Sequence, residues 1–248
     1  MMQKTVVIDV VGLSESIISD HTPYLKSYIE KNHLSKIKPV LPAVTTTAQS
    51  CYVTGKYPTD HGIVGNGWYD RTDAEVKFWK QSNQLVGSTK IWDEAKKKDP
   101  TFTCAKMFWW YNMYSSADYS VTPRPQYHAD GVKAPDCYSN PPELRDELQA
   151  ALGTFPLFNF WGPNANIKST NWIADASIYV DKKFQAGNWS KFPTVQWVNG
   201  TILALQKFRS IVGLLSFGSM KDKVFSYFGV KSPIVTAVSN IEKLAYSF

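Results

Sequence analysis

The feature that most constrains the fold is a short, nearly continuous apolar run close to the start of the chain. Thr5 to Val11 reads TVVIDVV, which is typical of a parallel strand that is covered on both faces. A helix is predicted over Pro23 to Asn32, with Thr22 as N-cap and proline at the first helical position. Lys36 to Val40 reads as a second strand. This alternation of strands and helices predicts an α/β domain with a mostly parallel sheet flanked by helices.

The remainder of the chain divides into a patterned region and a less regular C-terminal segment. At 248 residues the chain is long enough for one domain with a sizeable core. The further predicted elements are a helix over 89–98, strands over 102–110 and 119–122, helices over 141–152 and 171–184, a strand over 194–197, and helices over 202–212 and 241–246. Acidic residues and capping signals become rare after Gln185. We therefore expect a core over 1–184 with a loop-rich lid near 111–165. Three explanations stay open for the segment over 185–248: a diverged C-terminus, a truncation that leaves the fold incomplete there, or a tail encoded after a change of reading frame.

Asp9 interrupts the apolar run of the first strand. A carboxylate is costly to bury unless it is paired, hydrogen-bonded or bound to a metal. Ligand sites of open α/β sheets lie outside the carboxyl ends of the strands, which is where Asp9 falls. Two interpretations stay open: Asp9 is a metal ligand, or it accepts hydrogen bonds from loop N–H groups before Gly12.

The segment from Pro42 to Arg71 contains three consecutive threonines, which begin at Thr45. Thr46 and Gln49 fit a capping box, with Thr46 as N-cap, and Gly55 stands where a helix often ends with glycine. Thr45 would then lie beside a helix N-terminus, which favours anions. A hydroxyl next to such a site suits the transfer of a phosphoryl or sulfuryl group to a side chain. The simpler alternative is that these threonines only cap a helix.

With these residues in view, the chain resembles the alkaline phosphatase superfamily, and within it the nucleotide pyrophosphatase/phosphodiesterase-like branch. That branch begins with a strand ending in a metal-binding Asp, matched here by VVIDVVGLS. It has a nucleophilic Thr ten residues before the Gly of a VTGxYP segment, as Thr45 stands before Gly55. An HGIxxNxxYD turn follows, matched here by HGIVGNGWYD from His61 onward. The resemblance covers the first 70 residues and extends more weakly to the helix near 171–183.

The resemblance implies a metal-dependent hydrolase of phosphate esters, of the phosphodiesterase and nucleotide pyrophosphatase type. Thr45 would attack the phosphorus with the help of a divalent metal. Asp9 and Thr45 would hold this metal in part, and zinc is the metal that the resemblance implies. The covalent phospho-threonine intermediate would then be hydrolysed. By the same resemblance, the residues expected to bind a small phosphate-ester substrate are Thr46, Gln49, Asn66 and Tyr69.

The sequence also departs from the family's pattern. Relatives often carry an Asn shortly after the nucleophile, where this chain has Ala48 with Gln49 beside it. The superfamily completes two metal sites with histidines and aspartates in its C-terminal half, whereas this chain has no His after Gln185. The alternative function is therefore a catalytically impaired relative, or an anion- or nucleotide-binding protein that lacks the second set of metal ligands.

Two further possibilities come from other residue groups. A carbohydrate- or nucleotide-binding module would need several exposed tryptophans in one groove, drawn from Trp68, Trp109, Trp110 and Trp189. A metal site within the loop-rich segment 123–142 would use His128, Asp130 and Asp136, although their spacing matches no established arrangement of metal ligands.

Composition narrows the class of partner and compartment. The net charge of +6 and the pI near 9.0 suit an anionic substrate, and no nucleic-acid-binding motif is present. The three cysteines form no disulfide framework. The N-terminus has no signal-peptide pattern, and no apolar run is long enough to span a membrane. We expect a cytoplasmic protein without specific nucleic-acid binding.

Overall fold

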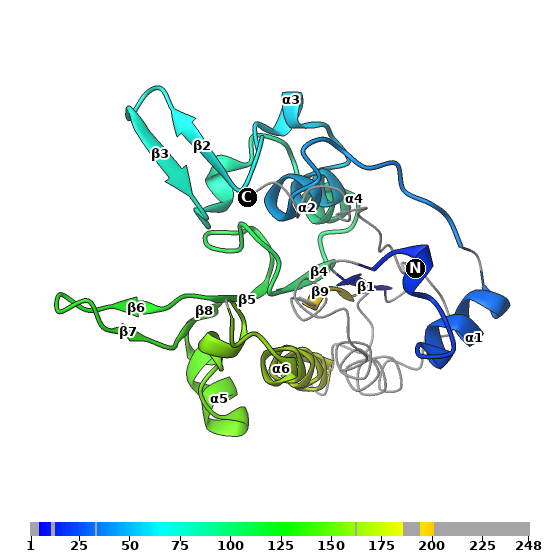
Figure 1. Ribbon diagram of the computed structural model, residues 1–248. Coiled ribbons are helices and arrows are strands. Elements are labelled where there is room, and N and C mark those ends of the chain that lie inside the picture. Colours follow the sequence, from blue (N-terminus) through cyan, green and yellow to red (C-terminus); the bar gives the residue numbers. More distant parts are fainter. Residues whose placement is uncertain (1–4, 11–12, 33, 162, 186–193, 201–248) are drawn as a thin grey trace.

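The structure is a computed structural model that describes residues 5–10, 13–32, 34–161, 163–185 and 194–200 (Figure 1). Its α-helices are α1 (Pro23–Lys31), α2 (Thr45–Thr54), α3 (Pro58–His61), α4 (Ile91–Lys98), α5 (Glu143–Leu152) and α6 (Ile167–Gln185). Its strands are β1 (Thr5–Val10), β2 (Gly67–Asp70), β3 (Glu75–Phe78), β4 (Thr103–Met107), β5 (Tyr119–Pro123), β6 (Gln126–Tyr127), β7 (Lys133–Ala134), β8 (Cys137–Asn140) and β9 (Thr194–Gly200). Short 3-10 helices cover Glu15–Ile17, Asn83–Leu85 and Leu157–Asn159.

The central sheet has five strands in the order β1-β9-β4-β5-β8. The pairs β1·β9, β9·β4 and β4·β5 are parallel, and β8 runs antiparallel to β5. The predicted α/β class with a mostly parallel sheet is confirmed. β9 pairs on both sides, and its Asn199 lies opposite Asp9 in the register with β1. The sheet therefore includes a strand from the segment expected to be divergent, while the predicted boundary at 184 stays a prediction.

Helices cover both faces of the sheet, with α2 and α4 on one side and α5 and α6 on the other (Figure 1). Because side chains alternate along a strand, β1 contributes to both layers. Ile8 and Val10 pack in the core that contains residues of α5 and α6. Val7 packs in a second core with Val53 of α2 and Trp92 of α4. Alternation places Asp9 on the same face as Val7, toward α2.

Three predicted elements need correction. The segment 36–40 forms no strand, because Pro39 removes a ladder donor and the side chains here are exposed or half-buried. The strand predicted over 102–110 ends at Met107, since the chain turns at Phe108, whose φ is 59°. The helix predicted from residue 89 begins at Ile91.

The loop-rich segment 123–142 contains the β6–β7 hairpin and the edge strand β8. The proposed lid over 111–165 stays a prediction. The helices predicted over 202–212 and 241–246 lie outside the described residues. Within the ranges that the structure describes, no helix combines the length and apolar character needed to span a bilayer.

Candidate active site

α2 places the three threonines at its N-terminus. The helix begins at Thr45, after Val44 in an extended conformation, and no side chain caps it. It ends at Gly55, whose φ of 64° is the predicted left-handed conformation. The predicted capping box is wrong, since Thr46 lies inside the helix and the Gln49 side chain bonds elsewhere. Thr45 nevertheless stands at the positive end of the helix dipole, where an anion is favoured.

The first turn of α2 is tied to the turn before β2. The backbone N–H of Thr46 donates to Asn66 Oδ1 at 3.0 Å, and the Thr46 hydroxyl lies 3.0 Å from the same oxygen and 2.7 Å from the carbonyl of Gly65. Because Asn66 Oδ1 accepts the bond from the Thr46 backbone N–H, the amide nitrogen of Asn66 is directed away from Thr46. Thr46 is fully buried, so it braces Asn66, which is itself half-buried.

Asp9 and α2 meet directly. Gln49 Nε2 donates to Asp9 Oδ2 at 2.9 Å. Gln49 lies four residues after Thr45, so the two side chains share one face of the helix. Burial raises the pKa of Asp9 from 3.8 to about 6, and the hydrogen bond from Gln49 acts in the opposite direction. The structure thus brings the end of β1 against the helical face that carries the half-buried Thr45.

A turn after β4 completes the inner side of the site. The backbone N–H of Trp110 donates to Gln49 Oε1 at 2.8 Å. Lys106 is 1% exposed, and its Nζ donates to the carbonyls of Trp110 and Tyr111 at 2.9 Å each. Burial lowers the pKa of Lys106 to about 7. The sequence does not single out this lysine, because nothing in its local pattern distinguishes it from a surface lysine.

The hairpin formed by β2 and β3 carries Tyr69, and Trp79 directly follows it. Tyr69, predicted to bind substrate, is 61% exposed on β2. Trp79 follows β3, donates its backbone N–H to the carbonyl of Asn66 at 3.0 Å, and packs edge-on against Trp110. Trp79 is 44% exposed, whereas Trp109 and Trp110 are buried. Of the other tryptophans of the predicted binding module, Trp68 is half-buried and Trp189 lies outside the described residues, so a groove lined by tryptophans stays a prediction.

His61, in the HGI motif, is a buried structural residue. Its Nδ1 accepts the backbone N–H of Ile63 at 3.1 Å, and its Nε2 lies 3.2 Å from Cys51 Sγ. Burial lowers the pKa of the imidazole. Both ring nitrogens therefore face protein partners, and His61 links α3 to α2.

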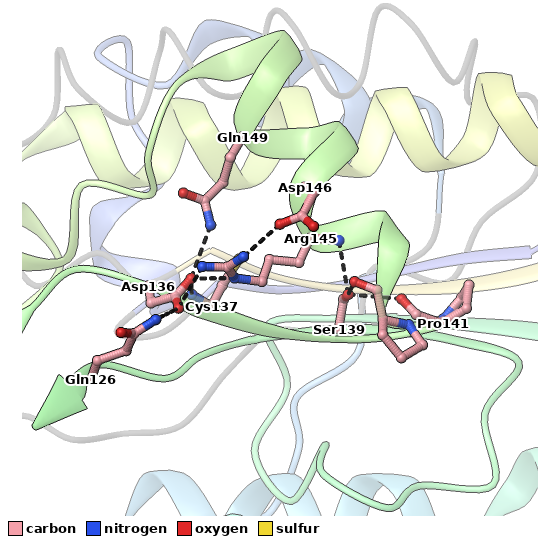
Figure 2. Close-up of polar contacts among 9 residues, drawn as sticks. Gln126, Asp136, Cys137, Ser139, Pro141, Arg145, Asp146 and Gln149 are labelled. Carbon is pink, nitrogen blue, oxygen red and sulfur yellow. Dashed lines mark hydrogen bonds and ion pairs between the residues drawn. The ribbon is translucent and has the colours of Figure 1, made fainter.

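Asp136 also has a structural role (Figure 2). Arg145 Nε and Nη2 donate to its two oxygens at 2.6 and 2.8 Å, and Gln149 Nε2 donates at 2.9 Å. Gln126 adds a further hydrogen bond. These partners lower the pKa of the Asp136 carboxyl against the effect of its burial. The carboxylate joins the β6–β7 hairpin to α5 and does not gather with His128 and Asp130 as a metal site.

The described residues supply part of a metal site. Asp9 is a buried carboxylate that accepts a hydrogen bond from the Gln49 amide, and its burial raises its pKa to about 6. A buried carboxylate is a suitable ligand for a divalent cation, so Asp9 fits that role, with Thr45 on the helical face that Asp9 meets. Within the described ranges, however, no group of three or more His, Cys, Asp or Glu side chains could hold a metal ion.

Solved structures with this fold come from bacterial and mammalian enzymes. Phosphonoacetate hydrolase from Sinorhizobium meliloti, in complex with phosphonoformate, aligns with a TM-score of 0.58 and 14% identity over 91% of this chain and 52% of that chain. Murine ectonucleotide pyrophosphatase/phosphodiesterase 5 aligns with a TM-score of 0.54 and 14% identity over 92% of this chain and 52% of that chain. An inactive threonine-to-alanine variant of the murine protein, in complex with AMP, gives a TM-score of 0.55 at 13% identity, over 92% of this chain and 53% of that chain. At these identities the likeness shows the fold, and the chain spans about half the length of these structures.

A family profile gives the decisive match. No curated protein sequence matches the chain significantly. The profile described as type I phosphodiesterase/nucleotide pyrophosphatase matches residues 5–195. The match confirms the resemblance to the nucleotide pyrophosphatase/phosphodiesterase branch of the alkaline phosphatase superfamily, and the matched region covers more than half of the chain. The protein belongs to the type I phosphodiesterase/nucleotide pyrophosphatase family.

Proposed function

We propose that the protein hydrolyses small phosphate esters, with Thr45 as the nucleophile and Asp9 as a ligand of a divalent metal. The observation that carries this proposal is the hydrogen bond from Gln49 to Asp9. Gln49 lies one helical turn after Thr45 in α2. This hydrogen bond brings the buried carboxylate of β1 against the face of α2 that bears the hydroxyl. The net charge of +6 suits an anionic substrate.

The reaction would proceed in two displacements. Thr45 Oγ1 gives up its proton to solvent and forms a bond to phosphorus, while the bond from phosphorus to the leaving oxygen breaks and the leaving group departs with the electron pair. Water then attacks the phosphoryl-threonine, which releases the product and restores the Thr45 hydroxyl. The amide nitrogen of Asn66 and the N-terminus of α2 would stabilise the negative charge on the transferring group. Thr46 and Gln49 would act indirectly, since both are buried and bonded within the protein.

Asp9 and Thr45 would hold the metal in part. A bound divalent cation lowers the pKa of an attacking hydroxyl or water and stabilises the leaving oxygen. Members of the family commonly bind zinc, but one carboxylate and one hydroxyl do not favour zinc over other divalent metals.

The solved structures support the class of substrate. Phosphonoacetate hydrolase was solved with phosphonoformate and with phosphonoacetate, both small anions. The inactive murine variant lacks a single threonine and holds AMP, which agrees with a threonine nucleophile and a phosphate-bearing ligand. We also propose a reducing compartment, the cytoplasm, for this protein, which agrees with the free state of its three described cysteines.

Turnover of an aryl phosphodiester tests the proposal. Purified protein is incubated with bis(4-nitrophenyl) phosphate and Zn²⁺ or Mn²⁺, beside Thr45→Ala and the exposed control Thr89→Ala. Turnover that requires the metal and Thr45, and that survives in the control, supports the enzyme. Absence of turnover, together with absence of metal by elemental analysis, identifies the chain as the non-catalytic relative.

A further inference from the structure

The side-chain amide of Gln49 is held at both ends inside the protein. Its Nε2 donates to Asp9 at 2.9 Å, and its Oε1 accepts the backbone N–H of Trp110 at 2.8 Å. These partners permit one orientation of the amide, because a backbone N–H only donates and an ionised carboxylate only accepts. Gln49 is 3% exposed. Its polar atoms are therefore committed to protein partners and not to a substrate.

The Trp110 end of this bridge is rigid. Lys106 Nζ binds the carbonyls of Trp110 and Tyr111 from within the core. Phe108 and Tyr111 have φ values of 59° and 53°, a conformation that non-glycine residues keep only when surrounding contacts enforce it. The turn thus presents the Trp110 N–H at a fixed place.

We infer that Gln49 is a positioning residue, which holds the Asp9 carboxylate against the face of α2 that carries Thr45 and uses the Lys106-braced turn as its anchor. The inference rests on the proposed function, because Asp9 acts there as a metal ligand. A side chain that hydrogen-bonds a metal ligand orients it, and removing such a partner typically lowers metal affinity or activity by 10–100-fold.

Two substitutions of Gln49 test its hydrogen bonds, one by replacing the donor to Asp9 and one by removing both bonds. Gln49→Glu keeps an oxygen to accept the Trp110 N–H but replaces the donor to Asp9 with a carboxylate. Gln49→Met has a similar length and removes both bonds without burying a charge, so it serves if Gln49→Glu does not fold. Gln84→Glu adds the same charge at an exposed position and is the matched control. Lys106→Met leaves Gln49 intact and loosens only the anchor.

The primary measurement is the position of Asp9 in crystal structures of the metal-free variants. We expect the carboxylate to leave its wild-type position in both Gln49 variants while α2 and Thr45 stay in place. Mn²⁺ binding by calorimetry should weaken by about 10–100-fold in both Gln49 variants, by less in Lys106→Met, and not in Gln84→Glu. With bis(4-nitrophenyl) phosphate, kcat should fall with little change in KM.

The two proposals can fail separately. If the wild type neither binds Mn²⁺ nor turns over, the proposed function fails, and the crystal structures alone decide the role of Gln49. If neither Gln49 variant folds, Lys106→Met decides, and an unmoved Asp9 carboxylate there contradicts the inference. An Asp9 carboxylate that keeps its place in Gln49→Met, with unchanged Mn²⁺ affinity, overturns it.

Discussion

Thr46 and Asn66 are joined twice, because Asn66 Oδ1 lies 3.0 Å from both the backbone N–H and the hydroxyl of Thr46. This contact fixes which end of the Asn66 amide faces α2. The oxygen is bound to the helix, so the nitrogen faces away from α2, and no hydrogen bond of that nitrogen is found within the described part of the chain. Structural and functional roles thus belong to different atoms of one side chain.

Asn66→Asp separates these two roles. The substitution keeps an oxygen to accept from Thr46 but replaces the N–H₂ group with negative charge, which repels an anionic substrate. We expect kcat/KM for bis(4-nitrophenyl) phosphate to fall by about 100-fold or more, as when one donor to a developing anion is lost. The free energy of unfolding in urea should change little. The exposed control Asn164→Asp should keep wild-type activity, and equal activity in Asn66→Asp would show that the amide nitrogen plays no part.

Asp9→Asn should make the metal-free protein more stable at neutral pH. The folded-state pKa of Asp9 is raised from 3.8 to about 6, so the folded protein binds this proton more tightly than the unfolded chain. Stability is therefore lost as pH rises from about 4 through 6. The neutral amide avoids that loss, and we expect a gain on the order of 2 kcal/mol at pH 7. Urea unfolding with chelator present measures it; a less stable Asn variant at pH 7, or a gain that is the same at pH 4, would refute the argument.

Lys106 should make stability depend on pH in the opposite direction. Its pKa falls from 10.5 to about 7 on folding, so between these values the unfolded chain binds more protons. Stability then rises with pH, by at most about 1.4 kcal/mol per pH unit for one proton. Lys106→Met loses two hydrogen bonds and should be less stable, but it should lack this slope. Urea unfolding at pH 7.5 and 8.5 compares the slopes, and identical slopes in both proteins would contradict a buried titrating lysine.

Asp136→Ala should lower stability without affecting catalysis. It removes the acceptor of Arg145 Nε and Nη2 and of two glutamine amides, while Arg145 Nη1 keeps its bond to Asp146 (Figure 2). Because Arg145 keeps some contact with water, we expect a loss of about 2–4 kcal/mol in the free energy of unfolding. The folded fraction should retain its kcat. A large fall in kcat at full folding would place Asp136 in the active site.

The sequence predicted the parts of the fold that depend on local pattern. The apolar run at Thr5 and the glycine after α2 act over a few residues, and both are confirmed. The strand predicted over 36–40 was wrong, because Pro39 cannot donate to a sheet and the side chains of this segment are exposed or half-buried. The strand predicted over 194–197 corresponds to β9, which continues to Gly200, because a central strand draws its stability from neighbours that are distant in sequence.

The candidate site was predicted unevenly for the same reason. Thr45, Asn66 and Asp9 stand in sequence blocks with a recognisable pattern. The capping box failed because Gln49 has better partners in Asp9 and Trp110, and both are far away along the chain. Lys106 could not be found at all, because its burial results from tertiary packing.

The most direct test of the central claim is to trap the covalent intermediate. Protein with Mn²⁺ is mixed with bis(4-nitrophenyl) phosphate, quenched in acid during turnover, digested and analysed by mass spectrometry. We predict a phosphoryl adduct, still bearing its second ester group, on Thr45, and none in Thr45→Ala. Turnover by wild type with no adduct at Thr45, or turnover that persists in Thr45→Ala, would contradict the account.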